Sequence, residues 1–257
     1  MMSKNIKKII IGNMKMNGSK EFNESLFSKL KHSLCAINNL DIVLCVPYPY
    51  LYQAQNMLAK SNLFWGSQNV AKYQDGAFTG EVSAPMLKEF GSEFVIVGHS
   101  ERSTAYCESD ENIAEKFNIV KKFNMTPILC VGETHIEREA GIMESVVSNQ
   151  LDTIINLYGK SILSNSIIAY EPIWAIGSDH AATSDQIQKM CSFIKKLVNK
   201  VSPANLKSLK VIYGGSVNSK NALQLCSLES VDGALIGRAS LDENEFSNIC
   251  QQVQKII

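Results

Sequence analysis

The sequence has no excess of charge of either sign. Lysine plus arginine number 25, and aspartate plus glutamate also number 25, so the formal net charge at pH 7 is zero. A chain of this balance is not expected to bind nucleic acid or an anionic membrane through its overall field. Any anion site must therefore be local, built from a few residues. No apolar run approaches the ~20 residues that a membrane span requires, and we expect no secretory leader.

Paired cysteines and clustered histidines are missing as well. No Cys-x-x-Cys motif occurs, and the histidines show no metal-ligand spacing. We therefore expect reduced, mostly buried thiols, a cytoplasmic location and no metal site. The seven cysteines are Cys35, Cys45, Cys107, Cys130, Cys191, Cys226 and Cys250, and the four histidines are His32, His99, His135 and His180.

No linker rich in proline, glycine or serine divides the chain, so we expect one domain over residues 1–257. Short runs of strand-forming residues recur along it, and most are continuously apolar, as in strands covered on both faces. The runs are 8–13, 41–46, 63–68, 94–97, 126–131, 167–170, 209–213 and 233–236.

Longer segments with helical patterning separate these runs. The clearest are 110–123, 144–158 and 185–201, and Thr183 to Gln186 fits a capping box at the start of the last one. Eight strand-then-helix units in about 250 residues predict an α/β fold, the (β/α)8 TIM barrel with a parallel eight-stranded core. A doubly wound open sheet stays an alternative, because element order alone does not show closure.

In either architecture, reactive residues collect at the carboxyl ends of the strands. Glu171 follows the run 167–170 and precedes Pro172, which cannot continue a strand ladder. The sequence therefore places this carboxylate at a strand end, where a catalytic base and a solvated loop acid are both open interpretations.

Two further strand ends carry candidate groups. Lys15 and Asn13 follow the first run, and a cation aimed at developing negative charge in a water-poor site is worth far more than in bulk water. His99 follows the fourth run and stands where a helix is expected to begin. The positive end of that helix would favour a neutral imidazole, which can polarise a carbonyl.

The last two units contain glycine-bearing turns, Tyr213-Gly214-Gly215-Ser216 and Gly237-Arg238-Ala239-Ser240. Glycine lets backbone N–H groups approach an anion, and barrel enzymes often bind phosphate after strands seven and eight. The two turns together predict a phosphate site.

With these residues laid out, the chain resembles the triosephosphate isomerase family along nearly its whole length. The resemblance rests on motifs kept in order: Gly12 to Asn17, Trp65 to Val70, Asp75 to Glu81, Val95 to Arg102, Leu129 to Thr134, Tyr170 to Gly177, Tyr213 to Ser216 and Asp232 to Gly237.

The family is itself a standard example of a glutamate base, a neutral histidine electrophile and a closing lid, so the roles come from the resemblance. It implies Glu171 as the base and His99 as the electrophile. Lys15 and Asn13 would stabilise an enediolate, and Glu101 would orient the surroundings of Lys15. Phosphate would be bound by backbone amides of Gly177, Ser216, Gly237 and Arg238.

The implied reaction interconverts D-glyceraldehyde 3-phosphate and dihydroxyacetone phosphate, a step of glycolysis and gluconeogenesis, without cofactor or metal. The implied lid comprises Pro172, Ile173, Trp174, Ala175, Ile176, Gly177, Ser178, Asp179 and His180.

The resemblance also implies a homodimer in which a loop of one subunit reaches the active site of the other. That loop comprises Gln74, Asp75, Gly76, Ala77, Phe78, Thr79, Gly80 and Glu81. Thr79 would lie near the partner subunit's Asn13 and Lys15.

Some positions depart from the family pattern. The lid tip reads Gly-Ser-Asp-His-Ala-Ala over 177–182, where Gly-Thr-Gly-Lys-Thr-Ala is common, and His180 would make lid closure sensitive to pH. Met14 replaces a tryptophan that is common in the family, Ser103 replaces a second arginine, and Arg238 replaces a glycine. None of these changes removes a catalytic group.

The alternatives to this function are another phosphate-binding barrel enzyme, such as a sugar-phosphate epimerase or an aldolase, and a non-catalytic barrel scaffold.

Overall fold

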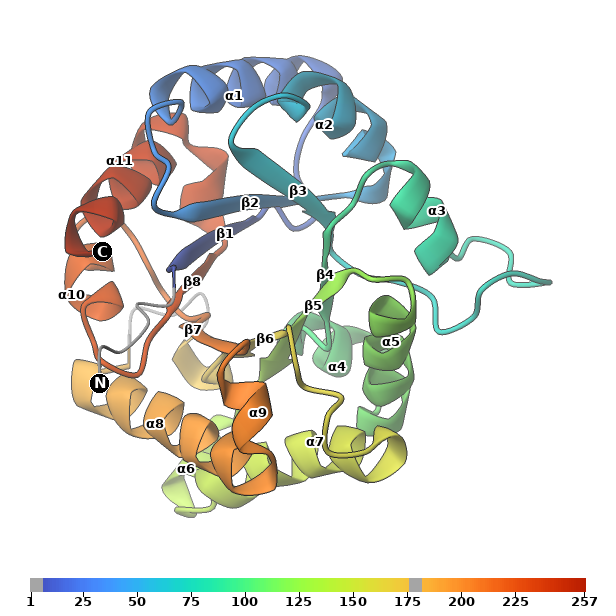
Figure 1. Cartoon of the computed structure of the whole chain (residues 1–257), viewed down its shortest axis with the longest axis vertical. Helices are drawn as coiled ribbons and strands as arrows, with labels where there is room; N and C mark the ends of the chain where they lie inside the picture. The colour runs from blue at the N-terminus through green and yellow to red at the C-terminus, as the bar shows by residue number, and fades with distance from the viewer. Residues whose placement is uncertain (1–6, 176–181) are drawn as a thin grey trace.

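The computed structural model describes residues 7–175 and 182–257. Its strands form one closed parallel barrel in the order β1 to β8, with β1 paired to β8 through Ile9–Gly233, Ile10–Ala234, Ile11–Leu235 and Gly12–Ile236 (Figure 1). The predicted (β/α)8 barrel is therefore confirmed, and the open-sheet alternative is wrong. The strands are β1 (Ile9–Asn13), β2 (Asp41–Val46), β3 (Leu63–Ser67), β4 (Phe94–Val97), β5 (Thr126–Val131), β6 (Ile167–Tyr170), β7 (Lys210–Tyr213) and β8 (Gly233–Ile236).

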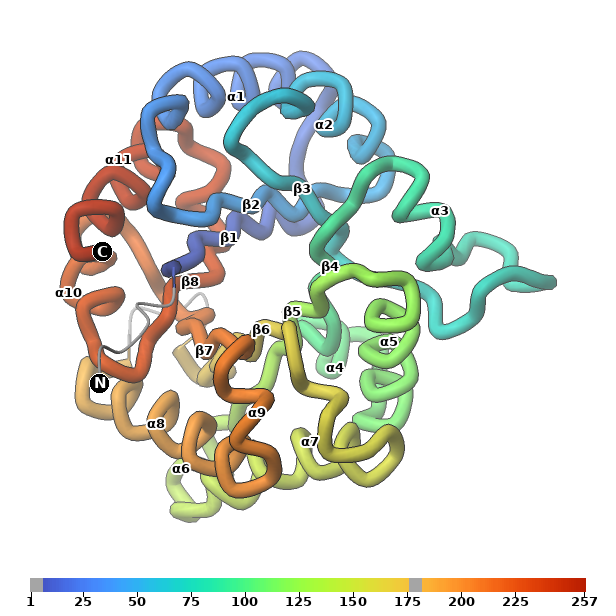
Figure 2. The backbone as a smooth tube through the Cα atoms, in the orientation of Figure 1, coloured from blue at the N-terminus to red at the C-terminus, as the bar shows by residue number. Residues whose placement is uncertain are grey.

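Helices surround the barrel, as the backbone tube in Figure 2 also shows. The α-helices are α1 (Lys20–Ser33), α2 (Leu51–Leu58), α3 (Ala84–Glu89), α4 (Ser100–Tyr106), α5 (Asp110–Lys122), α6 (His135–Glu139), α7 (Met143–Tyr158), α8 (Ser184–Val201), α9 (Pro203–Leu206), α10 (Ala222–Cys226) and α11 (Glu243–Val253). The 3-10 helices are η1 (Tyr48–Tyr50), η2 (Ile173–Ala175), η3 (Arg238–Leu241) and η4 (Gln254–Ile256).

The expected boundaries differ from these by one residue at most. Strands β1, β3 and β7 are each one residue shorter than the apolar runs that predicted them, because those runs extend into the adjoining turns. The capping box at α8 is present: the Thr183 side chain accepts from the N–H of Gln186, and the Gln186 side chain accepts from the N–H of Thr183. This reciprocal cap fixes where the chain re-enters helix after the lid region.

Side chains of each strand alternate between two apolar layers, which explains the continuously apolar runs. In β1, Ile9 and Ile11 point into the barrel, whereas Ile10 packs against the helices. The interior layer also contains Cys45, Cys130 and Ala169 among the residues that close off the barrel. Because the interior is filled, the barrel is a core and not a pore, and the chemistry is confined to its rim.

The connection between β3 and α3 leaves the body of the barrel and projects into solvent. In Figures 1 and 2 it extends beyond α3 as an isolated arm. Residues 74–81 are all exposed. We use the name arm for residues 72–81, which lie between Ala71 and Val82.

Candidate active site at the rim of the barrel

A cavity of about 920 Å³ opens at the carboxyl ends of the strands. Its lining comes from the segments that follow β1, β4, β6, β7 and β8, so five separate parts of the chain converge on one space. The residues predicted from the sequence that line it are Asn13, Lys15, His99, Glu171, Ser216, Gly237 and Arg238. Residues far apart in the chain meet here because parallel strands all end at the same rim.

Glu171 is the most enclosed carboxylate of the cavity, with 2% of its surface exposed. Its N–H donates to the carbonyl of Val131, which continues the pairing of β6 with β5 by one residue before Pro172 ends it. Two glycines make room for this residue. A Cβ at Gly132 would lie 1.9 Å from the Glu171 carbonyl oxygen, and one at Gly214 would lie 2.6 Å from its Cγ. The position of the Glu171 carboxylate therefore depends on the two glycines, Gly132 after β5 and Gly214 after β7.

His99 caps the short helix α4, as the sequence predicted for the residue before a helix start. Its Nδ1 accepts a hydrogen bond of 3.2 Å from the N–H of Glu101. A nitrogen that accepts carries no proton, so the neutral ring has its proton on Nε2. Nε2 lies 3.4 Å from Oε1 of Glu171. The ring thus presents an N–H donor to the same space that the carboxylate faces.

Lys15 reaches the cavity from a left-handed backbone conformation, with φ of 51°. Its N–H donates to Oδ1 of Asn13 at 3.0 Å, and its ammonium contacts Oε1 of Glu101 at 2.5 Å. Non-glycine residues adopt this conformation at a cost of about 1 kcal/mol or more, so the turn that aims Lys15 is held by its surroundings. Gly237 leaves space for the lysine, since a Cβ there would lie 3.3 Å from the Lys15 Cε.

A buried thiol lies beside the carboxylate. Burial first, and the Glu171 carboxylate second, raise the pKa of Cys130 well above its ordinary value. The thiol therefore stays protonated at neutral pH and is a weak donor near Glu171 rather than a nucleophile. This agrees with the packing role that its place in an apolar run indicates.

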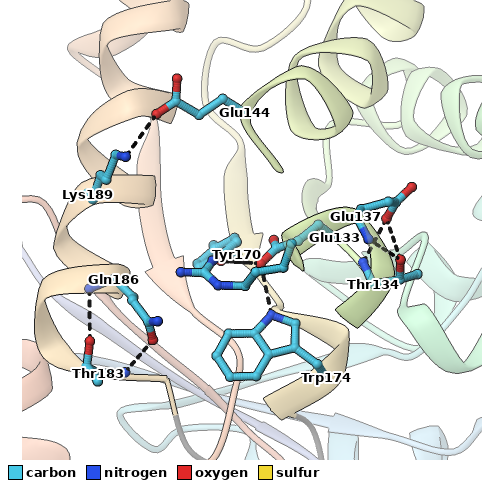
Figure 3. A network of polar contacts seen from close by, with 10 residues as sticks. Glu133, Thr134, Glu137, Glu144, Tyr170, Trp174, Thr183, Gln186 and Lys189 are labelled. Atoms are coloured by element: carbon cyan, nitrogen blue, oxygen red, sulfur yellow. Dashed lines mark hydrogen bonds and ion pairs between the residues drawn. The ribbon is translucent and has the colours of Figure 1, made fainter. Parts of the chain in front are cut away.

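Glu133 stands at a predicted strand end and is a functional candidate for which no role was predicted from the sequence. It is fully buried, and its Oε1 accepts from Nη1 of Arg138 at 2.9 Å, from the Tyr170 hydroxyl at 3.0 Å and from Nε1 of Trp174 at 2.9 Å (Figure 3). Trp174 belongs to the predicted lid, so this carboxylate ties the first end of the lid to the rim. Burial first, and the Glu133 charge next, raise the pKa of Tyr170, which keeps its hydroxyl protonated as a donor.

The signal for Glu133 was present in the sequence as an acid directly after a strand. The hydrogen-bond partners of Glu133 could not be predicted from the sequence, because Arg138 and Trp174 belong to two different segments, α6 and η2. Arg138 also lies with its guanidinium carbon 5.0 Å from the Trp174 ring centre. All three donors bond to Oε1 of Glu133, one of them charged, whereas its Oε2 is buried without a hydrogen-bond partner among the described residues.

The two glycine turns stand side by side on the cavity wall. In the first, Gly215 could not carry a side chain, because a Cβ there would lie 2.1 Å from the Tyr213 hydroxyl. In the second, η3 begins at Arg238, and the Ser240 hydroxyl donates to the carbonyl of Gly237 at 2.7 Å.

Several predicted residues lie elsewhere. Glu101 does not line the cavity but contacts both Lys15 and His99. The arm does not line it either. Of the predicted lid, Pro172 and η2 are described, whereas Ile176, Gly177, Ser178, Asp179 and His180 lie outside the described residues.

Two other kinds of feature are absent from residues 7–175 and 182–257. No group of three or more His, Cys, Asp and Glu side chains in this part of the chain could hold a metal ion. No helix among the described residues is long and apolar enough to cross a membrane.

Comparison with known proteins gives a consistent result. The triosephosphate isomerase family model matches residues 8–253. The triosephosphate isomerase of Nitrosomonas europaea is 44% identical over 245 residues, covering 95% of this chain and 97% of the relative. That of Thiobacillus denitrificans is 45% identical over 249 residues, covering 97% and 99%. A crystal structure of triosephosphate isomerase from Bartonella henselae superimposes with a TM-score of 0.87 at 34% identity and covers 96% of this chain and 99% of that one. On this evidence, the chain belongs to the triosephosphate isomerase family.

Proposed function

We propose that this chain interconverts D-glyceraldehyde 3-phosphate and dihydroxyacetone phosphate with Glu171 as the base and His99 as the electrophile. The observation that carries the proposal is the 3.4 Å approach of Glu171 Oε1 to His99 Nε2 inside a cavity that also contains Lys15. A base, a neutral N–H donor and a cation around one space are the groups that an enediolate requires.

The reaction begins with proton removal from the carbon next to the substrate carbonyl by the Glu171 carboxylate. Negative charge then develops on the carbonyl oxygen, where the Nε2–H of His99 donates and the Lys15 ammonium stabilises it. The same imidazole passes a proton between the two oxygens, and Glu171 returns its proton to the neighbouring carbon. Asn13 supports this arrangement because its side chain accepts from the N–H of Lys15 and fixes the turn.

The substrate phosphate would be held by the backbone N–H groups of Ser216, Gly237 and Arg238, together with that of Gly177. The two turns that carry the first three amides border the same cavity as Lys15. Binding energy from the phosphate can then be used to close a lid over the reacting carbons and exclude water. Glu133 would anchor the first end of that lid through Trp174.

A coupled isomerase assay of the purified chain tests this proposal. We expect turnover of both triose phosphates, in either direction, after extensive treatment with a chelator. A scaffold protein with the same fold would show none. An aldolase acting through a lysine would be trapped by borohydride in the presence of substrate, so a stable mass adduct on Lys15 would contradict the isomerase mechanism.

We further infer a homodimer in which the arm of one subunit completes the active site of the other. Thr79 is an exposed residue of the arm, which projects into solvent beyond α3 (Figure 1). A loop of this kind outside a compact domain is typically functional, and docking into a second copy would bury it.

Replacing Thr79 with Arg is expected to produce a monomer with activity lowered about 100-fold. A displacement of catalytic groups by about 1 Å has an effect of that size. Sedimentation and specific activity measured on one dilution series give both quantities. Thr153→Arg, on the outer helix α7, is the matched control and should remain dimeric and active. Full activity in a monomeric Thr79→Arg variant would contradict the proposed completion of the site.

A cytoplasmic location also belongs to the proposal. All seven cysteines are free thiols, five of them buried, which suits a reducing compartment.

A further inference from the structure

The arm is fastened at its base although it projects into solvent. The N–H of Ala71 donates to the carbonyl of Val82 at 2.8 Å, which closes the ten-residue loop between them. Within the loop, the N–H of Phe78 donates to the carbonyl of Gly76 at 2.9 Å, and the N–H of Glu81 donates to the carbonyl of Phe78 at 3.0 Å. None of these bonds joins residues 72–75 to the second half of the arm.

An aromatic stack supplies that link. The rings of Tyr73 and Phe78 lie parallel, with centroids 3.7 Å apart and an interplanar angle of 3°. Gly76 makes the approach possible, because it adopts φ of +120° and a Cβ there would lie 3.1 Å from Cε2 of Phe78. Both rings keep about two-fifths of their surface exposed, Tyr73 43% and Phe78 39%. The stack therefore joins the two limbs of the arm without being part of the barrel core.

Lys72 fastens the same limb to the barrel. Its ammonium donates to Oδ1 of Asn112 at 2.8 Å and pairs with Oε2 of Glu115 at 2.6 Å, both on α5. It also lies 5.4 Å from the centre of the Tyr73 ring. The bond to Glu115 raises the pKa of Lys72, so the cation stays charged at neutral pH. Tyr73 therefore lies between Lys72, which is bound to α5, and the ring of Phe78 in the second half of the arm.

A loop ordered before docking loses less conformational entropy on docking than a flexible one. The effect appears as tighter association without any added contact. Neither ring lines the catalytic cavity, so the stack does not act there directly.

We propose that the Tyr73–Phe78 stack is a staple that preorganises the arm for docking into a second copy of this chain, with Tyr73 as a positioning residue. The inference rests on the homodimer proposed above and identifies a feature that raises the affinity between its two subunits. Phe78 is close to Thr79, at the part of the arm assigned to the partner, whereas Tyr73 lies at the base and acts through Phe78.

The test compares Tyr73→Ala with Tyr73→Phe, which keeps the ring. Tyr73→Ala should raise the dimer dissociation constant about 10-fold, the upper effect of an aromatic pair, and Tyr73→Phe should stay within about twofold of the wild type. Sedimentation at equilibrium over a dilution series gives the constants. Leu157→Ala, which removes a half-exposed apolar side chain from α7, is the control and should leave the constant unchanged.

A second measurement separates preorganisation from direct contact with the partner. In a Thr79→Arg monomer, hydrogen exchange of the amides in 72–81 should become faster when Tyr73→Ala is added. If Tyr73 only touches the partner, exchange in the monomer will not change, and the staple is refuted.

The two proposals can fail separately. A wild type that is monomeric and fully active at all concentrations overturns the homodimer and the staple with it. A dimeric wild type whose constant matches that of Tyr73→Ala overturns the staple alone.

Discussion

Replacing Glu171 with Gln is expected to lower kcat by about 10³- to 10⁴-fold, the upper range for the loss of a positioned general base. Gln has the size of Glu but cannot accept a proton at neutral pH. The substrate contacts proposed for Lys15 and the glycine turns do not involve Glu171, so KM should change little. The loss is therefore expected in kcat, which marks an interaction made only in the transition state.

The surroundings of Glu171 strengthen this expectation. Its carboxylate is almost completely buried beside the Cys130 thiol, a weak donor, and it contacts the Nε2–H of His99 at 3.4 Å and the N–H of Ser100 at 3.5 Å. Both contacts are long for hydrogen bonds, so the carboxylate is not fully satisfied in the folded protein. Such a site is suited to accepting a proton and contributes little to stability. Glu171→Gln should therefore melt at the wild-type temperature or above it.

Single-turnover and steady-state assays of Glu171→Gln, Glu171→Asp and Glu144→Gln measure this prediction. Glu171→Asp keeps the carboxylate but withdraws it by one methylene, and we expect a loss of about 100-fold, as for a displacement of about 1 Å. Glu144 is a half-buried acid on α7 that pairs with Lys189 at 3.9 Å, away from the cavity, so Glu144→Gln serves as the control. A Glu171→Gln enzyme that keeps a tenth of the wild-type kcat would show that another group is the base.

Much of the rim was predictable because strand ends are local features. An apolar run followed by Pro172 identifies the end of β6 from neighbouring residues alone, and the start of α4 behind His99 is similarly local. Because the strands are parallel, their eight carboxyl ends then meet at one rim without any further information. For this reason Glu171, His99 and Lys15 could be assigned to one site before any contact between them was known.

Closure of the sheet and contacts between distant side chains could not be predicted in this way. Pairing of β1 with β8 is a property of the whole chain, and the open sheet has the same order of elements. The Glu133 anchor depends on side-chain directions in three segments, none of which has a distinctive pattern by itself. The Tyr73–Phe78 stack depends on the φ of Gly76, which the sequence permits but does not require.

Replacing Lys15 with Met should lower kcat/KM about 10³-fold, as for the loss of a preorganised group that stabilises an oxyanion. Unlike the loss at Glu171, this one should be divided between kcat and KM. In the proposed mechanism the Lys15 charge would face both the substrate phosphate, because Lys15 lies beside Gly237, and the developing enediolate. Kinetics over a range of ionic strengths should also show a weaker salt dependence than in the wild type, because one attractive charge has been removed.

Lys60 provides a closely matched control for this substitution. It is also a lysine in the left-handed region, with φ of 63°, but it lies in the exposed turn between α2 and β3. Lys60→Met should leave kcat/KM unchanged. Both variants keep the backbone conformation and lose at most a surface ion pair worth about 1 kcal/mol or less, so both should melt within a few degrees of the wild type.

A third variant separates the charge of Lys15 from its ion pair. Glu101→Gln removes the carboxylate that contacts the ammonium at 2.5 Å but keeps the cation in the cavity. We expect it to reduce kcat/KM by about 10-fold or less, the effect of losing one orienting hydrogen bond. If Glu101→Gln and Lys15→Met were equally impaired, the pair would act as a structural unit. A loss of kcat/KM confined to Lys15→Met would assign the effect to the positive charge of Lys15. A phosphate dianion and an enediolate both require such a charge.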